Sequence, residues 1–131
     1  MAETLLVMSK GTAGREADYL AWYEDRHLSD VVGVPGVVSG RLCRLVDGAS
    51  NRQWEVAARY EVSTTVGEVV AGFGAVAGTE RMPLTDAIDA AGVLMLAATP
   101  IRPRQVGPNG PDRSDGLLFI VLTNSTPGDD E

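Results

Sequence analysis

The sequence predicts an α+β domain with one antiparallel sheet and helices packed on a single face. Apolar runs typical of strands alternate with segments of helical spacing, in the order strand, helix, strand, strand, helix, strand. That order is the ferredoxin-like βαββαβ arrangement. Size agrees, because 131 residues, 44% of them hydrophobic, suffice for one buried core.

The first half of the chain predicts a strand, a long helix and a second strand. Residues 4–9 (TLLVMS) are a short apolar run followed by a glycine-containing turn. From Arg15 to Asp30 the aromatic residues recur at helical spacing. The sequence GVPG at residues 33–36 ends this helix, and residues 37–47 are rich in apolar and β-branched side chains.

Residues 53–62 have the clearest alternation in the chain and predict a third strand, joined to the second by a turn at residues 48–52. Glu55, Arg59 and Glu61 point to one face. The opposite face carries the apolar set Trp54, Val56, Ala58, Tyr60 and Val62.

The next segment predicts a helix, a shorter helix and a fourth strand. Thr65 and Glu68 have capping-box spacing, and apolar residues recur at helical spacing from there to Ala77. Residues 82–91 predict a short helix opened by Thr85. Residues 93–99 predict the fourth strand.

The domain organisation predicted is a unit at residues 1–103, a linker at 104–116 and an extra strand and turn at 117–131. A shift of 114 places Leu5–Glu16 over Phe119–Asp130, with three identical positions and five conservative ones. This predicts a tandem repeat. Either the chain is a piece of a longer protein, or the fifth strand has a local use such as exchange between subunits.

Composition excludes several classes of function. The net charge of −7, from 11 basic and 18 acidic residues, argues against nucleic acid and anionic membranes as partners. One cysteine and one histidine furnish neither a disulfide framework nor a structural zinc site. No signal peptide or membrane span is recognised. We therefore expect a cytoplasmic protein without metal or cofactor.

The most informative stretch is WYEDRHLSDVVGVPG at residues 22–36, followed by Val38-Ser39 and later by Tyr60-Glu61-Val62. Residues 4–103 resemble the EthD-like branch of the dimeric α/β-barrel superfamily. The resemblance implies that two ferredoxin-like units pair sheet against sheet, as a homodimer or as tandem halves. Members of the superfamily include cofactor-free polyketide cyclases and dehydratases, monooxygenases, lactone isomerases and haem-handling proteins.

His27, the only histidine, is the candidate catalytic acid or base. Tyr23 precedes it by one helical turn and Asp30 follows it by three residues, so either side chain can orient the imidazole. A histidine is suited to moving protons to or from an enolisable substrate. The alternative is a histidine that packs the end of the helix.

The candidate substrate-binding residues are aromatic side chains and two arginines. Trp22, Trp54 and Tyr60 could line an aromatic pocket, or Trp54 and Tyr60 could simply pack in the core. Arg41 and Arg59 lie on neighbouring strands. In a sheet-to-sheet barrel they could bind a carboxylate or enolate, and ion pairs with Glu55 or Glu61 are the simpler account.

The function that these features favour is a cofactor-independent enzyme acting on a small apolar or aromatic carbonyl-bearing metabolite. The reaction would be that of a lyase, cyclase, dehydratase or isomerase. One alternative is a non-catalytic ligand-binding or structural half-barrel whose partner unit holds the site. The other is a cofactor-free monooxygenase.

Overall fold

The computed structural model describes residues 3–46 and 53–110. Four strands form one sheet in the order β2-β3-β1-β4, with every neighbouring pair antiparallel. Their bounds are β1 Glu3–Ser9, β2 Val37–Arg44, β3 Val56–Val62 and β4 Leu94–Ala98. The predicted ferredoxin-like order is confirmed, since β1 lies in the middle beside β3 and β4.

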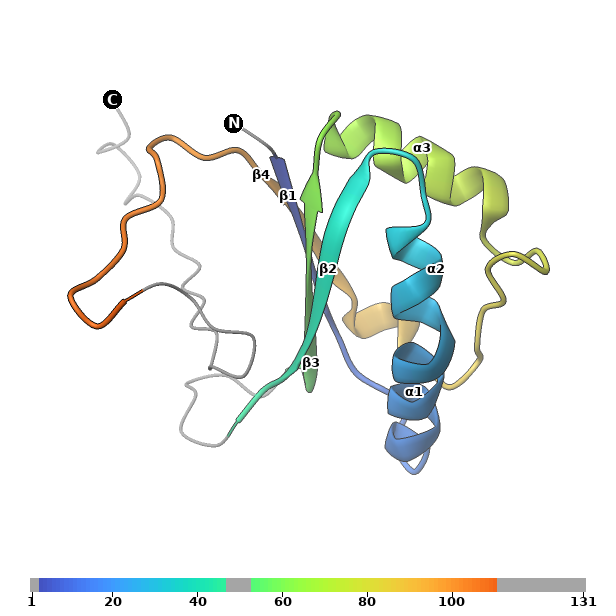
Figure 1. Ribbon diagram of the computed structural model, residues 1–131. Coiled ribbons are helices and arrows are strands. Elements are labelled where there is room, and N and C mark those ends of the chain that lie inside the picture. Colours follow the sequence, from blue (N-terminus) through green and yellow to red (C-terminus); the bar gives the residue numbers. More distant parts are fainter. Residues whose placement is uncertain (1–2, 47–52, 111–131) are drawn as a thin grey trace, which may run out of the picture.

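The helices lie together on one side of this sheet (Figure 1). The first is continuous from α1 (Glu16–Trp22) through a π-helical turn (Tyr23–His27) into α2 (Leu28–Val32), and it ends at Gly33, where the GVPG sequence was predicted to end it. The other long helix is α3 (Val66–Val76), and a 3-10 turn (Ala90–Gly92) precedes β4. The predicted cap is confirmed, because the Thr65 hydroxyl accepts the Glu68 backbone N–H at 3.1 Å.

The strand registers assign alternate side chains to the two faces of the sheet. On β3 the helix-covered face carries the predicted apolar set from Val56 to Val62, each at most 4% exposed. Gly40 on β2 is needed for this packing, because a Cβ there would lie 2.8 Å from the Tyr60 ring. The opposite face carries Arg41 and Arg59, in register across β2 and β3.

Two predicted elements are wrong in detail. β3 begins at Val56, so Trp54 precedes the strand, and its indole N–H donates to the Gly92 carbonyl at 2.8 Å. Residues 82–89 are not helical. Their backbone instead bonds across the fold, with Thr12 N–H donating to the Ala87 carbonyl and Asp89 N–H to the Lys10 carbonyl. These long-range bonds replace the i to i−4 bonds of the predicted helix.

The predicted linker begins as exposed coil at residues 104–110, with a turn closed by the Gly110 N–H on the Gly107 carbonyl. The remainder of the linker, the fifth strand and the proposed repeat at 117–131 lie outside the described residues, as does the turn at 48–52. No helix within residues 3–46 and 53–110 has the length and apolarity needed to cross a membrane.

Candidate functional site

His27 lies in a cluster of aromatic rings built on the π-helical turn. Its ring stacks on Trp22 with centroids 4.2 Å apart and meets Tyr23 edge-on at 4.9 Å. Residues five apart lie about 140° apart around an α-helix, whereas the wider π turn brings them together. The turn at Tyr23–His27 therefore explains the stack of Trp22 on His27. Such turns occur frequently at functional sites.

His27 is only 8% exposed, and its Nδ1 atom has no hydrogen-bond partner. Burial lowers its pKa to about 4, against the smaller opposing effect of the Asp30 charge. The ring is therefore neutral at pH 7. A neutral imidazole has one N–H donor and one lone-pair acceptor, so Nδ1 has either a proton to give or a lone pair to accept one.

Tyr23, which contacts this ring, is paired with a second phenol, Tyr60. The hydroxyl oxygens of Tyr23 and Tyr60 are 2.8 Å apart and share a hydrogen bond. Burial raises the pKa of both phenols, that of Tyr60 to about 12. Both therefore stay protonated. One O–H donates to the other oxygen, so the pair has one O–H left to donate to a substrate oxygen. Tyr60 is thus part of both the core and the predicted site.

Asp30 is not hydrogen-bonded to Nδ1 of His27. Its carboxylate instead pairs with Arg26, whose Nε lies 2.9 Å from Oδ2. Arg26 also donates to the Glu80 carbonyl at 2.7 Å. Asp30 thus affects His27 through its charge, and its direct contact is with the arginine that bonds the 79–89 loop.

Trp22 is fixed from the loop side as well, because its indole N–H donates to the Pro83 carbonyl at 3.1 Å. Two rings that sequence reasoning did not assign to the site complete the cluster. Phe73 of α3 meets His27 edge-on at 6.0 Å, and Tyr19 meets Tyr23 edge-on at 5.9 Å. The sequence indicated the position of Tyr19 only through its helical spacing from Tyr23. No local sequence pattern indicates the contact of Phe73 with His27.

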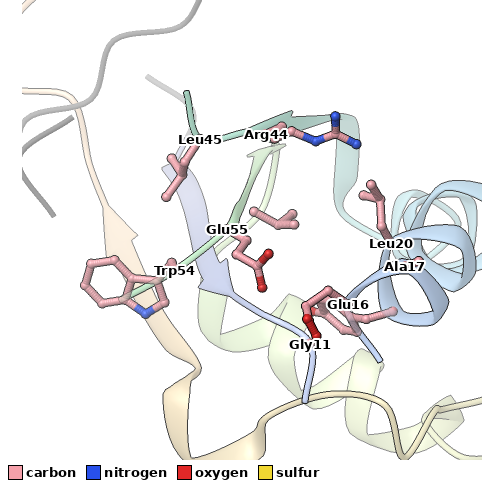
Figure 2. Close-up of a pocket in the computed structure, with 10 residues that line it drawn as sticks. Gly11, Glu16, Ala17, Leu20, Arg44, Leu45, Trp54 and Glu55 are labelled. Atoms are coloured by element: carbon pink, nitrogen blue, oxygen red, sulfur yellow. The ribbon is translucent and has the colours of Figure 1, made fainter. Parts of the chain in front are cut away.

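A pocket of about 480 Å³ opens between α1 and the adjoining ends of β2 and β3 (Figure 2). Tyr19 lines it and hydrogen-bonds Ser9 through its hydroxyl at 2.6 Å. Trp54 lines the same pocket and also a neighbouring one of about 420 Å³ near Asp89. Neither pocket is lined by His27, although Tyr19 touches both the larger pocket and the ring cluster.

The predicted site residues therefore occupy separate places. Trp22, Tyr23 and His27 of the first helix lie together, and Tyr60 of β3 joins them through its hydrogen bond to Tyr23. Trp54 lies at the end of the sheet, and Arg41 and Arg59 lie on its helix-free face. For Arg59 the simpler alternative is confirmed, because its Nη2 lies 2.6 Å from Oε1 of Glu61.

The described residues offer few ligands to a metal or a haem. No three His, Cys, Asp or Glu side chains among them lie close enough to hold a metal ion. His27, the only histidine of the chain, is enclosed by Trp22, Tyr23 and Phe73. This geometry does not fit an axial haem ligand, which needs open space on one side of the ring.

Comparison with solved structures identifies the same fold elsewhere. An ethyl tert-butyl ether d (ethd) family protein from Bacillus halodurans matches with a TM-score of 0.51 and 11% identity, over 77% of this chain and 100% of that one. The chain has an EthD-like fold. The predicted resemblance is thereby confirmed at the level of fold, and no family model or curated protein matches the sequence.

Two further solved structures share the fold. The haem-degrader MhuD from Mycobacterium tuberculosis, with two haems bound in its active site, matches with a TM-score of 0.51 and 16% identity over 79% of this chain and 99% of that one. HapK from Hahella chejuensis matches with a TM-score of 0.50 and 15% identity over 80% and 98%. At such identities the likeness concerns the fold, and function has to be argued from the site.

Proposed function

We propose that this protein is a cofactor-independent enzyme that carries out acid–base chemistry with His27 on a small, apolar or aromatic, carbonyl-bearing molecule. The observation that carries the proposal is the buried Nδ1 atom without a partner. A buried polar atom left unsatisfied costs about 1–3 kcal/mol, so its presence calls for an explanation. A substrate group that bonds this nitrogen supplies one.

The surroundings of His27 suit a carbonyl substrate. Trp22 and Phe73 offer apolar ring surface, while the hydroxyl pair of Tyr23 and Tyr60 has one free O–H to donate to an oxygen that gains negative charge on enolisation. A neutral imidazole can take a proton from carbon and return it elsewhere. The reaction class is therefore proton transfer beside a carbonyl, as in a lyase, cyclase, dehydratase or isomerase.

The pocket beside α1 is the proposed entrance for the ligand. Its volume of about 480 Å³ lies within the usual range for small-molecule sites. Tyr19 separates the pocket from the rings around His27, so a substrate reaches the imidazole when this cluster rearranges. The hydrogen bonds of Trp22 to Pro83 and of Arg26 to Glu80 define the loop that must adjust.

We also propose that two copies pair through the helix-free faces of their sheets. Leu6 of β1 and Leu96 of β4 face each other there and are partly exposed. No helix or strand of the described residues covers this face at Leu6 and Leu96, although Met8 and Ala57 on the same face are already buried within the single chain. The sheet-to-sheet pairing implied by the sequence resemblance would bury Leu6 and Leu96.

Deuterium exchange into phenylacetone tests the chemistry directly. Its benzylic hydrogens are acidified by the carbonyl, and their loss in deuterium oxide is followed by proton NMR. The wild-type protein should accelerate the exchange by at least about 100-fold over buffer, within the usual range for general acid–base catalysis. His27→Gln should remove the acceleration while the variant remains folded by circular dichroism.

The matched control is Asp25→Asn, which changes an exposed carboxylate of the same helical turn. It should exchange at the wild-type rate. Equal rates in wild type and His27→Gln would remove His27 from the mechanism. Exchange at the buffer rate, with phenylacetone bound according to chemical-shift changes, would instead favour the non-catalytic half-barrel, a candidate that the tight enclosure of His27 supports.

A further inference from the structure

Two arginines face each other on the helix-free side of the sheet. Arg41 of β2 and Arg59 of β3 are direct partners in the antiparallel register. Side chains in that relation point to the same face with Cβ atoms about 4.5–5.5 Å apart, and like charges so placed repel. The strand alternation assigns them to the face opposite Tyr60, hence away from the His27 cluster.

The charges around this pair do not balance within the described residues. Arg59 forms an ion pair with Glu61, two residues further along the same strand and on the same face. The Arg59 Nη2 atom lies 2.6 Å from Oε1 of Glu61. Arg41 has no ion pair with any residue in 3–46 or 53–110. One positive charge per protomer therefore remains on this part of the sheet.

Apolar side chains continue the same face. Leu6 of β1 lies opposite Arg59, and Leu96 of β4 lies opposite Leu6. The guanidinium groups thus border apolar side chains whose burial is favourable, whereas burial of the charged guanidinium groups themselves is unfavourable. A guanidinium stays charged over the physiological pH range, so the mismatch cannot be relieved by loss of a proton.

We infer that Arg41, together with Arg59, forms a binding site for a carboxylate-bearing ligand at the interface between two copies of the chain. The inference rests on the proposed sheet-to-sheet dimer, in which each copy would contribute one excess positive charge to the interface. Planar guanidinium groups bind carboxylates through two parallel hydrogen bonds. A dicarboxylate matches the two charges of the symmetric pair.

The site is separate from His27 in position and in chemistry. His27 lies on the helix-covered side among neutral rings, whereas Arg41 lies on the other side beside a charged pair. A ligand between the sheets would stabilise the dimer, because it binds the assembled form and not the monomer.

Succinate is the probe, and Arg41→Met is the variant, since methionine keeps an apolar stem without the charge. Light scattering after gel filtration gives the dimer dissociation constant, with and without succinate, against sodium chloride at equal ionic strength. Succinate should lower the wild-type constant by at least about tenfold, that is about 1.4 kcal/mol. The Arg41→Met dimer should form without succinate and should not respond to it.

Arg44→Met is the matched control, because Arg44 lies on the same strand but on the other face. This variant should respond to succinate like the wild type. Equal loss of response in both variants, an equal effect of sodium chloride, or a stronger effect of inorganic phosphate would overturn the inference. A monomer under all conditions would refute the proposed dimer, whereas a dimer insensitive to succinate refutes the anion site alone.

Discussion

The two faces of the sheet differ in the charge and the burial of their polar groups. On the helix-covered face the polar atoms are neutral and buried, as in the hydroxyl pair of Tyr23 and Tyr60 at 2.8 Å. On the other face they are charged and partly exposed, as in Arg59 and Glu61, whose side chains are 38% and 36% exposed. Substitutions on the first face should therefore change the free energy of unfolding, and those on the second should change association.

The largest effect should come from Tyr60→Ala on the covered face. Tyr60 is 1% exposed, and its loss leaves both a cavity and an unpaired Tyr23 hydroxyl. Truncations of this size cost about 3–5 kcal/mol, to be measured by urea unfolding of the wild type and the variant. Tyr60→Phe, which keeps the ring, should lose only about 1–2 kcal/mol. A loss below about 1 kcal/mol for Tyr60→Ala would show that the covered face is not packed as described.

Stability should also fall on acidification, because His27 is buried as a neutral ring. Its pKa is lowered from 6.5 to about 4, so the unfolded chain binds a proton in this window while the folded chain does not. The free energy of unfolding should therefore decrease as the pH falls from about 6.5 towards 4, by about 2 kcal/mol between pH 7 and pH 5.

Urea unfolding of the wild type and His27→Gln at several pH values isolates this contribution. The carboxylates contribute equally to both proteins, so the difference between the two curves belongs to His27. Curves that run parallel through this window would mean that His27 has an ordinary pKa and is more accessible than its 8% exposure indicates.

The covered face was largely predictable from the sequence. Helical spacing put Tyr19, Trp22, Tyr23 and His27 on one side of their helix, and alternation along residues 53–62 separated Tyr60 from Arg59. Both patterns are local, and both are confirmed by the ring contacts and registers. The same alternation already placed Arg59 and Tyr60 on different sides of the sheet.

The long-range parts of the site could not be predicted. The stack of Trp22 on His27 depends on the π-helical turn, and we recognise no local sequence pattern that predicts this turn. The loop at residues 82–89 bonds to the backbone near Thr12, and those bonds override the local preference for a helix. The displacement of Trp54 from β3 follows from its bond to Gly92, a residue 38 positions away.

The smallest expected effect lies on the helix-free face, where it also reports on the dimer. A double-mutant cycle on Arg59→Ala and Glu61→Ala, measured as free energies of unfolding, gives the coupling energy of this pair. The pair is partly exposed in the single chain and should contribute at most about 1 kcal/mol. At protein concentrations where dimers predominate, the partner's sheet would exclude water from the pair. The coupling should then exceed about 1.5 kcal/mol, as for close charge pairs within interfaces. A coupling that does not change with protein concentration would mean that this face stays open to solvent, which would contradict sheet-to-sheet pairing.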